Sequence, residues 1–566
     1  MDSIQEQVVK FKNDYQHIKE LPSTNASLLR SSGHVLDEET TLVGMEDVFS
    51  NIRDQLTGQA SELNVVSIVG MGGIGKTTLA KIIFSDPSIV CRFDVSSWVI
   101  VSQEYDAREM LLDVLSFVTP GAKLIYHGKT YDQLLELVYR KLKCRRYLIV
   151  LDDVCSIEAW DHVIRSFPDD NNGSRIIITT RLLEVADSAS NGCPPHHVPF
   201  LNSESSWNLL SDKVFGKEDC PPQLEEIGKQ IAQQCQGLPL SAVVVAGLLS
   251  KIPKTYDDWK KAAENVISHV GSTSEQCLAI LALSYNYLPC SLKACFLYMG
   301  LFAEDADINA DYHEKLEEVA EECLVDLVSR SLIIVSRSGA SGKIRSCRIH
   351  DLVRLLCLRE GEAAKFFHVK GKYFKVSPEG KQVIRRLCLH PDDLQNKNLG
   401  LEKDSLDSVR TILCLGEPNT YLEDPECCKK INSRFQLLRV LDLESIRFSC
   451  FPSEITQLVQ LRYVACTTGT DVPASISNLW NLQTLIVLPV TNQLSLPQEV
   501  WKLSSLRHFN PGGMCVHAPS ITHNFLGLEN LETVDSIRTA NSNWKEIFSA
   551  VPRVQKLGVL IHPDHH

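Results

Sequence analysis

A glycine-rich stretch between residues 70 and 78 contains residue types that bind the phosphates of a nucleotide. It reads Gly70-Met71-Gly72-Gly73-Ile74-Gly75-Lys76-Thr77-Thr78, which fits the spacing G-x-x-x-x-G-K-[ST]. Glycines at this spacing let successive backbone N–H groups point at phosphate oxygens. Lys76 would neutralise the β- and γ-phosphates, and the Thr77 hydroxyl would be a ligand of Mg²⁺. The stretch therefore predicts a nucleotide site formed by Gly70, Gly72, Gly73, Gly75, Lys76, Thr77 and Thr78.

An apolar run that ends in two acids, Leu148-Ile149-Val150-Leu151-Asp152-Asp153, predicts the other half of this site. A buried strand with this ending brings carboxylates to the carboxyl edge of a sheet, where ligands bind. Asp152 would hold Mg²⁺, directly or through water, and Asp153 would orient or deprotonate an attacking water. Arg181 follows a further apolar run and would reach a γ-phosphate. On the residues alone, Arg181 could equally be a surface arginine that binds no ligand.

These residues must be positioned by alternating strands and helices. Apolar residues at helical spacing follow the glycine stretch at 79–84, and helices are also predicted at Tyr131–Leu142 and Ser203–Phe215. Such alternation requires crossover connections, so it predicts an α/β domain with a mostly parallel sheet and helices on both faces. The predicted strands are Val65–Val69, Phe93–Val101, Tyr147–Leu151, Arg175–Thr179 and His197–Phe200.

Length and composition limit the class of protein. The 566 residues suffice for three or four domains, and the net charge of −13 argues against a nucleic-acid binder. The 19 cysteines are scattered without a CxxC pair, which favours free thiols and gives no support to a zinc site. The longest apolar run, 242–249, is too short to cross a membrane, so no transmembrane segment is predicted. A cytoplasmic location fits best, with the nucleus or peripheral membrane attachment left open.

The last third of the chain repeats itself. Similar tetrads begin at 438, 461, 482, 506, 531 and 554, so the intervals are 21 to 25 residues. An aliphatic residue follows three positions after each of three prolines, Pro452, Pro473 and Pro497. This period predicts a leucine-rich-repeat α/β solenoid over 405–566, with one short strand per repeat on a concave face. Since no polar capping unit follows the last repeat start, we expect the array to be truncated.

The order of these motifs resembles one family, the plant nucleotide-binding leucine-rich-repeat disease-resistance proteins of the coiled-coil branch. Their shared NB-ARC module is similar to this chain at many points in a fixed order. The resemblance implies a P-loop domain followed by helical and winged-helix domains and then the repeats. It is carried by Leu42-Val43-Gly44, Gly70–Thr78, Leu151–Val154, Gly173–Arg181, Gly237-Leu238-Pro239-Leu240, Cys295–Tyr298 and Ile349-His350-Asp351.

The resemblance also implies roles for single residues, with ADP or ATP and Mg²⁺ as the ligands. The backbone of Val43 and Gly44, together with Pro239, would flank the adenine. Arg181 would sense the γ-phosphate of ATP. His350 would contact the β-phosphate of ADP from the winged-helix domain, and an imidazole donates well to phosphate oxygens.

By this resemblance the chain would be an intracellular immune receptor in plant defence and an ADP/ATP-gated switch. Its repeats would restrain the switch and recognise a pathogen effector or a host guard protein, and activation would produce a homo- or hetero-oligomer. As an enzyme it would at most hydrolyse ATP slowly to reset the switch. Two alternatives are a truncated, non-signalling decoy or nucleotide-binding scaffold, and a constitutive ATPase.

The same comparison sets the expected domain limits. They are 1–40 for a helix remnant and linker, 41–218 for the P-loop domain, 219–285 for the helical domain, 286–375 for the winged helix and 405–566 for the repeats. The chain passes from 305–308 almost directly to 316–320, where the family normally has another helix. We therefore expect a shortened winged-helix domain and a protein truncated at both ends.

Overall fold

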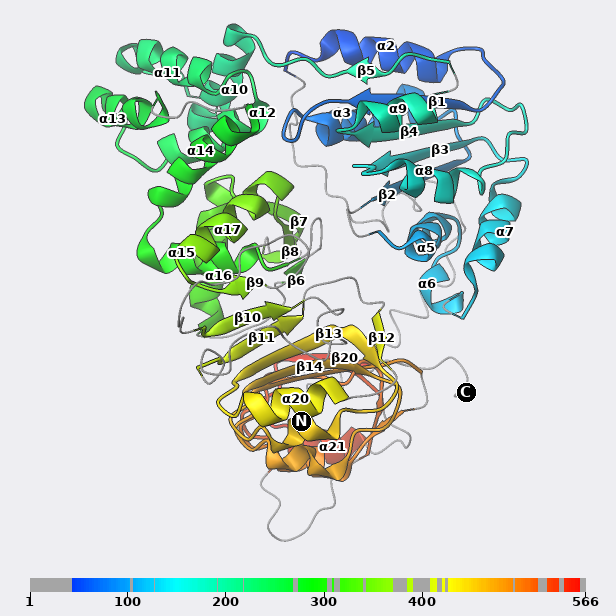
Figure 1. The fold of residues 1–566 in the computed structure, drawn as a ribbon, viewed down its shortest axis with the longest axis vertical. Coiled ribbons are helices and arrows are strands. Elements are labelled where there is room, and N and C mark those ends of the chain that lie inside the picture. The colour runs from blue at the N-terminus through cyan, green and yellow to red at the C-terminus, as the bar shows by residue number, and fades with distance from the viewer. Residues whose placement is uncertain are drawn as a thin grey trace.

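The protein folds into a series of domains that ends in a curved solenoid (Figure 1). The P-loop domain, in blue and cyan, and the helical domain, in green, lie at the top of this view, with the yellow-to-red repeats at the bottom. The computed structural model describes residues 43–101, 105–126, 128–190, 192–216, 218–267, 273–302, 308–309, 316–338, 343–369, 384–389, 408–414, 420–422, 426–491, 494–517, 527–538 and 544–559. The helix remnant and linker expected at 1–40 lie outside the described residues.

Five parallel strands form the first sheet, in the order β2-β3-β4-β1-β5. They are β1 Asn64–Val69, β2 Val95–Ile100, β3 Tyr147–Asp152, β4 Arg175–Thr180 and β5 His196–His197. This confirms the predicted parallel α/β sheet. The strand predicted at 197–200 is wrong beyond His197. Pro199 has no N–H to pair, although the N–H of Val198 still donates to the carbonyl of Val69 at 2.9 Å.

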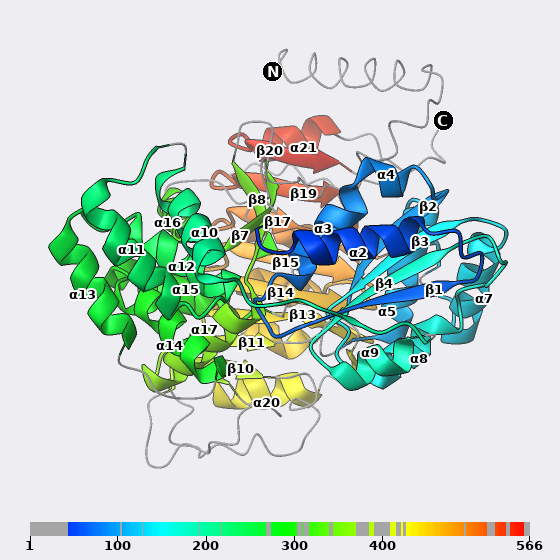
Figure 2. The same ribbon diagram turned by 90° about the horizontal axis from the view of Figure 1, so that it is seen from above.

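Both faces of this sheet are covered, because successive residues of each buried strand point to opposite sides. In β3, Leu148 and Val150 join one apolar cluster, while Tyr147, Ile149 and Leu151 join the other. Figure 2 shows α2 and α3 on one face of the sheet and α8 and α9 on the other. The helices of this domain are α2 Glu46–Thr57, α3 Lys76–Ser85, α4 Pro87–Val90, α5 Ala107–Val118, α6 Ala122–Ile125, α7 Tyr131–Leu142, α8 Ile157–Ile164 and α9 Leu183–Ala189.

A helical domain follows, built from α10 Ser203–Phe215, α11 Pro222–Gln234, α12 Pro239–Leu249 and α13 Tyr256–Ile267. It begins before the predicted limit of 219, because α10 packs in one apolar cluster with α11, α12 and α13. Pro239 is the first residue of α12, a position that needs no N–H donor. Gly247 in α12 lets the winged-helix domain approach closely, since a Cβ there would lie 2.2 Å from the carbonyl oxygen of Arg330. The helical and winged-helix domains are therefore in direct contact.

The winged-helix domain combines helices with a small antiparallel sheet of order β6-β8-β7. The helix α14 Thr273–Asn286, which ends at the predicted helical limit of 285 to within one residue, contributes residues to the apolar clusters of both domains. The winged-helix elements after it are α15 Cys290–Met299, β6 Ile308–Asn309, α16 Leu316–Ser329, β7 Ile334–Ser338, β8 Ile344–Arg348, α17 Asp351–Ala363 and β9 His368–Val369. One apolar cluster runs from the P-loop domain through Leu238 and Val244 into this domain. Residues 303–307 and 310–315, where the sequence suggests a missing helix, lie outside the described part of the chain.

The repeats form a parallel sheet that begins earlier than the predicted limit of 405. Its continuous path runs β9-β10-β11-β13-β14-β15-β17-β19-β20, so the last strand of the winged-helix domain is its first rung. The strands are β10 Arg386–Leu389, β11 Thr411–Cys414, β12 Thr420–Leu422, β13 Val440–Phe448, β14 Tyr463–Thr468, β15 Thr484–Pro489, β16 Ser495–Leu496, β17 His508–Asn510, β18 Cys515–Val516, β19 Thr533–Ile537 and β20 Lys556–Val559.

The convex side of the solenoid carries helices and short 3₁₀ turns. These are α20 Glu426–Arg434, η2 Ser453–Gln457, η3 Ala474–Asn478, η4 Gln498–Lys502 and α21 Trp544–Ala550. Pro452, Pro473 and Pro497 each come directly before one of the three 3₁₀ turns. The regular spacing of these prolines and of the buried leucines behind the strands confirms the predicted leucine-rich-repeat solenoid.

Arg386 fastens the solenoid to the winged-helix domain. Its guanidinium carbon lies 4.1 Å from the ring centroid of Phe366 and 5.5 Å from that of Tyr298. Its Nε donates to the Tyr298 hydroxyl at 3.1 Å, and its Nη1 donates to the Phe366 carbonyl at 3.1 Å. One arginine thus ties the second rung of the sheet to α15 and to the segment after α17.

Candidate functional site: a phosphate loop closed by the winged helix

The glycine stretch forms a tight loop between β1 and α3. Gly73 and Gly75 have φ of +74° and +101°, conformations that favour glycine. A Cβ on Gly75 would lie 2.8 Å from the Met45 methyl carbon, and one on Gly73 would lie 2.8 Å from the Leu240 Cβ. The backbone conformation therefore favours glycine at both positions, and at Gly73 the Leu240 Cβ also leaves no room for a side chain. No side chain caps the start of α3, so its first N–H groups are available to an anion.

Lys76 lies inside this loop. It is the first residue of α3, and only 7% of it is exposed. Its Nζ donates to the Met71 carbonyl at 3.1 Å, which folds the side chain back along the loop. Burial lowers the pKa of Lys76, an effect that nearby Asp153 opposes. An anion bound at the loop would stabilise the charged amine that burial disfavours.

Asp152 ends β3 and is buried beside the start of α3. The hydroxyls of Thr77 and Thr179 donate to its Oδ1 at 3.0 Å and 2.6 Å. Burial raises the pKa of Asp152, although both hydrogen bonds oppose that shift. A buried carboxylate next to a threonine hydroxyl supplies the hard oxygen ligands that Mg²⁺ prefers. The predicted pair of Thr77 and Asp152 is therefore brought together.

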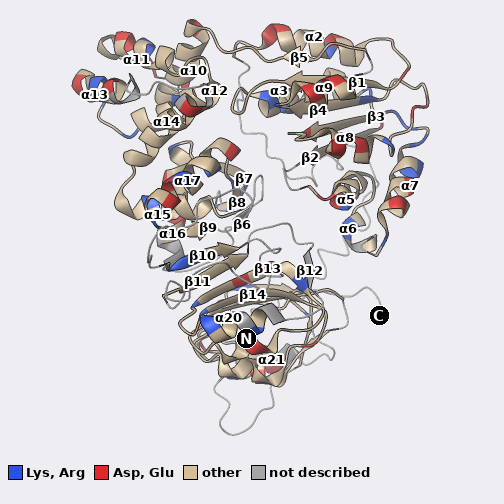
Figure 3. Cartoon of the chain, viewed as in Figure 1, with Lys and Arg blue, Asp and Glu red and all other residues tan. Residues whose placement is uncertain are grey.

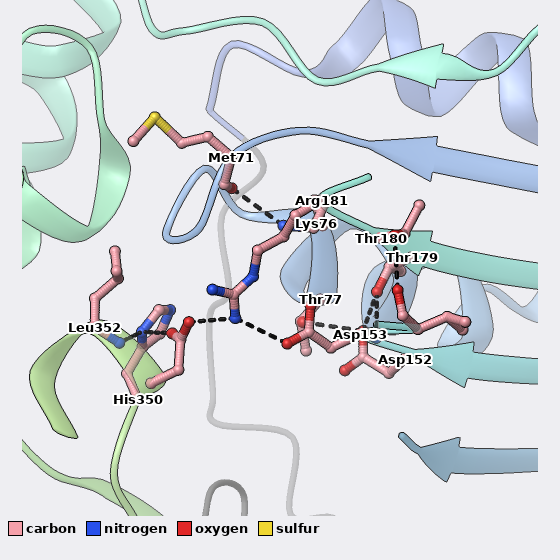
Figure 4. Close-up of polar contacts among 12 residues, drawn as sticks. Met71, Lys76, Thr77, Asp152, Asp153, Thr179, Thr180, Arg181, His350 and Leu352 are labelled. Atoms are coloured by element: carbon pink, nitrogen blue, oxygen red, sulfur yellow. Dashed lines mark hydrogen bonds and ion pairs between the residues drawn. The ribbon is translucent and has the colours of Figure 1, made fainter. Parts of the chain in front are cut away.

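Arg181 lies between two carboxylates that come from different domains (Figure 4). Its Nη2 donates to Asp153 Oδ2 at 2.9 Å and also contacts the carboxylate of Asp351 at the start of α17. Burial alone would raise the pKa of Asp351, but His350 and Arg181 hold that pKa well below its usual range. The stabilisation from this ion pair is thus present at any pH above about 4, and protonation removes it only in stronger acid.

His350 caps α17 and does not extend away from the winged-helix domain. Its Nδ1 accepts a hydrogen bond from the Leu352 N–H at 3.2 Å and contacts the Asp351 carboxylate. The start of α17 nevertheless reaches the phosphate loop, because a Cβ on Gly72 would lie 3.4 Å from Leu352 Cδ1 and 3.5 Å from Arg181 Nη1. Gly72 and Leu352, which are 280 positions apart in the sequence, therefore meet at one loop.

The two segments expected to flank adenine share one neighbour, Leu201. A Cβ on Gly44, which has φ of +70°, would lie 3.0 Å from Leu201 Cδ2. The N–H of Leu201 also donates to the carbonyl of Gly237 at 2.9 Å, two residues before Pro239. Val43 and Gly44 therefore come close to the start of α12, beside the loop.

Sequence reasoning missed several residues that shape this site. Thr179 hydrogen-bonds Asp152, and Met45, Leu240 and Leu352 close the loop from three sides. The position of Thr179 at the end of a buried strand beside β3 could have indicated it. The other three are ordinary apolar residues within or directly after the motifs at 42–44, 237–240 and 349–351, and their contacts with the loop depend on the tertiary fold.

These observations fit a nucleoside polyphosphate with a divalent cation. The loop offers uncapped N–H groups and a buried amine, and a buried acid with two threonine hydroxyls adjoins it. Arg181 adds a guanidinium on the far side. Thr78, the remaining predicted member, follows Thr77 in the first turn of α3.

Replacing Asp152 by asparagine should stabilise the protein when nucleotide and metal are absent. The change removes a buried charge, whose pKa burial raises, and keeps an oxygen that accepts from both threonines. We expect the first unfolding midpoint in EDTA to rise by about 2–4 °C, the shift that about 1 kcal/mol produces in a domain of this size. Asp153→Asn is the control, because that carboxylate is paired with Arg181. A lower midpoint for Asp152→Asn would contradict the expectation.

Models of three protein families match the chain. The NB-ARC domain matches residues 45–220, the disease-resistance-protein winged-helix domain matches 301–357, and a leucine-rich-repeat region matches 423–563. The first of these gives the chain a nucleotide-binding P-loop NTPase domain. Within the described residues, no helix is both long and apolar enough to cross a bilayer.

The chain is also similar to curated plant proteins. A late blight resistance protein homolog of Solanum demissum is 36% identical over 520 residues, which are 87% of this chain and 39% of the relative. The late blight resistance protein R1-A of the same plant is 34% identical over 546 residues, or 91% and 42%. The chain thus spans about two-fifths of the length of these relatives.

Among solved structures, a signal transduction ATPase with a tetratricopeptide-repeat sensor from Pyrococcus horikoshii aligns with a TM-score of 0.37 and 18% identity. The alignment covers 58% of this chain and 45% of that one. A similarity at this level carries no argument about function.

Proposed function

The chain belongs to the plant nucleotide-binding leucine-rich-repeat disease-resistance proteins, and from that premise we propose that it acts as the nucleotide-gated switch of an intracellular immune receptor. In this proposal ADP favours the closed arrangement, and exchange for ATP with Mg²⁺ favours an open state that forms oligomers. The observation that carries the proposal is the contact of Arg181 with both Asp153 and Asp351, which joins the P-loop domain to the winged helix beside the phosphate loop.

In this mechanism Arg181 binds either Asp351 or the γ-phosphate, depending on the nucleotide. With a diphosphate in the loop, its guanidinium stays on Asp351 and holds the winged helix closed. With a triphosphate, the same guanidinium turns to the γ-phosphate, and the ion pair across the domains is lost. His350 and Pro239 would support the closed state from the phosphate and adenine sides. Lys76 and the N–H groups of α3 would bind the phosphates in either state.

The free energy that such a switch requires explains why the repeats are part of this proposal. Changing a two-state ratio from 1:99 to 99:1 requires about 5.5 kcal/mol of differential binding. One charge-assisted hydrogen bond contributes about 1.5–3 kcal/mol. The nucleotide therefore supplies only part of the difference. The repeats, which share a sheet with β9, and a pathogen effector or host guard protein bound to them would supply the rest.

Slow hydrolysis suits this proposal better than rapid turnover. Asp153, the candidate base, accepts a hydrogen bond from Arg181 at 2.9 Å, so its carboxylate is engaged in the closed state. The test is to purify the protein, release its nucleotide with acid and identify it by chromatography. About one ADP per chain with very slow turnover supports the switch. Many turnovers per minute would indicate a constitutive ATPase, and an empty site would contradict the proposal.

Replacing Asp351 by valine should loosen the closed state. The change removes the winged-helix partner of Arg181, a contact of about 1–2 kcal/mol for a pair buried to this degree. We expect ADP to dissociate about 5- to 30-fold faster and cell death when the variant is expressed in leaf tissue. The control is Glu225→Val, which removes an exposed pair within one helix. Normal protein levels without cell death would favour the decoy alternative, and unchanged ADP release would contradict the role of the ion pair.

A further inference from the structure

Four arginines form a column along the edge of the solenoid where its strands begin. The backbone N–H of Arg410 donates to the Arg385 carbonyl at 2.8 Å, that of Arg439 to Arg410 at 2.8 Å, and that of Arg462 to Arg439 at 2.7 Å. These residues therefore follow one another at the spacing of neighbouring strands, about 4.8 Å. Figure 3 shows cationic residues in blue where β10 begins, at one end of this column.

This arginine column has no acidic partners among the residues that the structure describes. Arg385, Arg439 and Arg462 are exposed, and the Arg410 side chain donates to backbone carbonyls of its own turn. Like charges at adjacent rungs disfavour each other. The three exposed arginines have no ion pair within the described residues that offsets this repulsion, which points to an external anion.

The same series of backbone hydrogen bonds continues into the following strands, and a contact there indicates which anion the arginine column can bind. Gln483, Arg507 and Glu532 continue the ladder through backbone hydrogen bonds of 2.8 Å each. There Arg507 donates to both carboxylate oxygens of Glu532, at 2.9 Å and 3.0 Å. A carboxylate at this edge can therefore take the forked geometry of a guanidinium, and a partner carrying carboxylates could do the same farther along the column.

An apolar column lies beside the strand starts at Arg439, Arg462 and Gln483, so it overlaps the second half of the arginine column. Leu437, Val459 and Trp480 are 46%, 40% and 59% exposed, and each lies two or three residues before a ladder position. The Asn481 side chain donates to the carbonyl of Val459 at 3.1 Å, so these turns stack in register. Exposed apolar residues repeated in three successive turns mark a contact surface.

We propose that the arginine column and the apolar column together dock an acidic segment of another protein, with apolar side chains beside its carboxylates. The aliphatic members of the apolar column suit a protein partner, and the net charge of −13 opposes nucleic acid. The four arginines span about 14 Å, which matches about ten residues of helix. This inference names the chemistry of the partner that the proposed function assigns to the repeats, and it rests on that function to this extent.

The test uses the full chain and a fluorescein-labelled 16-residue helical peptide with glutamates on one face and leucines beside them. We expect binding by fluorescence anisotropy that weakens as salt rises. The variant Arg385→Glu, Arg439→Glu, Arg462→Glu should weaken binding about 10- to 30-fold, and Trp480→Ala should weaken it about threefold. The matched control, Lys429→Glu, Arg553→Glu, Lys556→Glu, changes the net charge equally at other exposed sites of the repeats.

Several outcomes would overturn this inference. They are no binding of the peptide at low salt, equal loss in the two triple variants, equal binding of a peptide with the same composition in scrambled order, or tighter binding of single-stranded RNA than of the peptide. Bound nucleotide is measured on the same preparations. A normal ADP content with no peptide binding would contradict the docking surface alone, whereas an empty nucleotide site would contradict the proposed switch and leave the peptide result standing by itself.

Discussion

Replacing Lys76 by alanine should leave the purified protein without bound nucleotide. The amine lies in the phosphate loop at the start of α3, where it would contact two phosphates. Losing charge-assisted hydrogen bonds of about 1.5–3 kcal/mol weakens binding about 10- to 150-fold. Nucleotide content after gel filtration, measured by acid release and chromatography, checks this. Lys129→Ala, at an exposed position, is the control and should keep its nucleotide.

The stability of the same variant separates a binding role from a structural one. Burial lowers the pKa of Lys76, so its charged form is disfavoured in the empty loop. At a pH below the usual lysine pKa, the buried charge therefore lowers the stability of the folded protein. Removing it should not lower the unfolding midpoint of the nucleotide-free protein. A large drop in that midpoint would mean that the contact of Nζ with the Met71 carbonyl is mainly structural. Unchanged nucleotide content would contradict the site itself.

Replacing Arg386 by alanine should release the solenoid from the winged-helix domain. The change removes contacts with two aromatic rings and two hydrogen bonds. Together these contribute about 2–3 kcal/mol to the junction. We expect backbone amides of β9 and β10 to exchange hydrogen about 30- to 150-fold faster, measured by mass spectrometry.

Arg385 provides the matched control for this junction. It is the preceding residue and has the same charge, but its side chain is exposed. Arg385→Ala should leave exchange in β9 and β10 unchanged. If the two alanine variants behaved alike, the aromatic contacts of Arg386 would not hold the domains together. Faster exchange should also accompany faster ADP release, provided that the repeats restrain the switch.

Local patterns predicted the P-loop domain well. The glycine loop, the acids after β3 and the helices at 131–142 and 203–215 depend on residues close in sequence, and the structure contains each of them. The leucine period likewise identified the solenoid. Strand β10 was not predicted as part of the repeats, because it lies before the predicted limit of 405; β11 lies inside that limit, although the regular 21- to 25-residue interval starts only at Leu438. Strand β10 joins the sheet by pairing with β11, and β11 pairs with β13, and no local pattern encodes either pairing.

The candidate site was predictable only in part. Thr77 and Asp152 lie 75 positions apart, and the parallel sheet brings them together as expected. The pair of Arg181 and Asp351 joins two domains, and charge alone could not select it among so many acidic residues. The Nδ1 of His350 caps α17, and the expected contact of this histidine with the β-phosphate stays a prediction. A capping histidine and a ligand-binding histidine look the same in sequence, since both follow a strand and precede a helix.

The shared sheet makes the solenoid a mechanical lever. Nine strands lie on its continuous path, and β9 of the winged-helix domain is the strand at one end of it. At about 4.8 Å per strand, the far end lies about 38 Å along the sheet from β9. Turning the winged-helix domain by about 10° would sweep that end through about 7 Å. Conversely, a sideways force on the last repeats acts through the longest arm on the junction at Arg386 and, in the proposed switch, on the ion pair between Arg181 and Asp351.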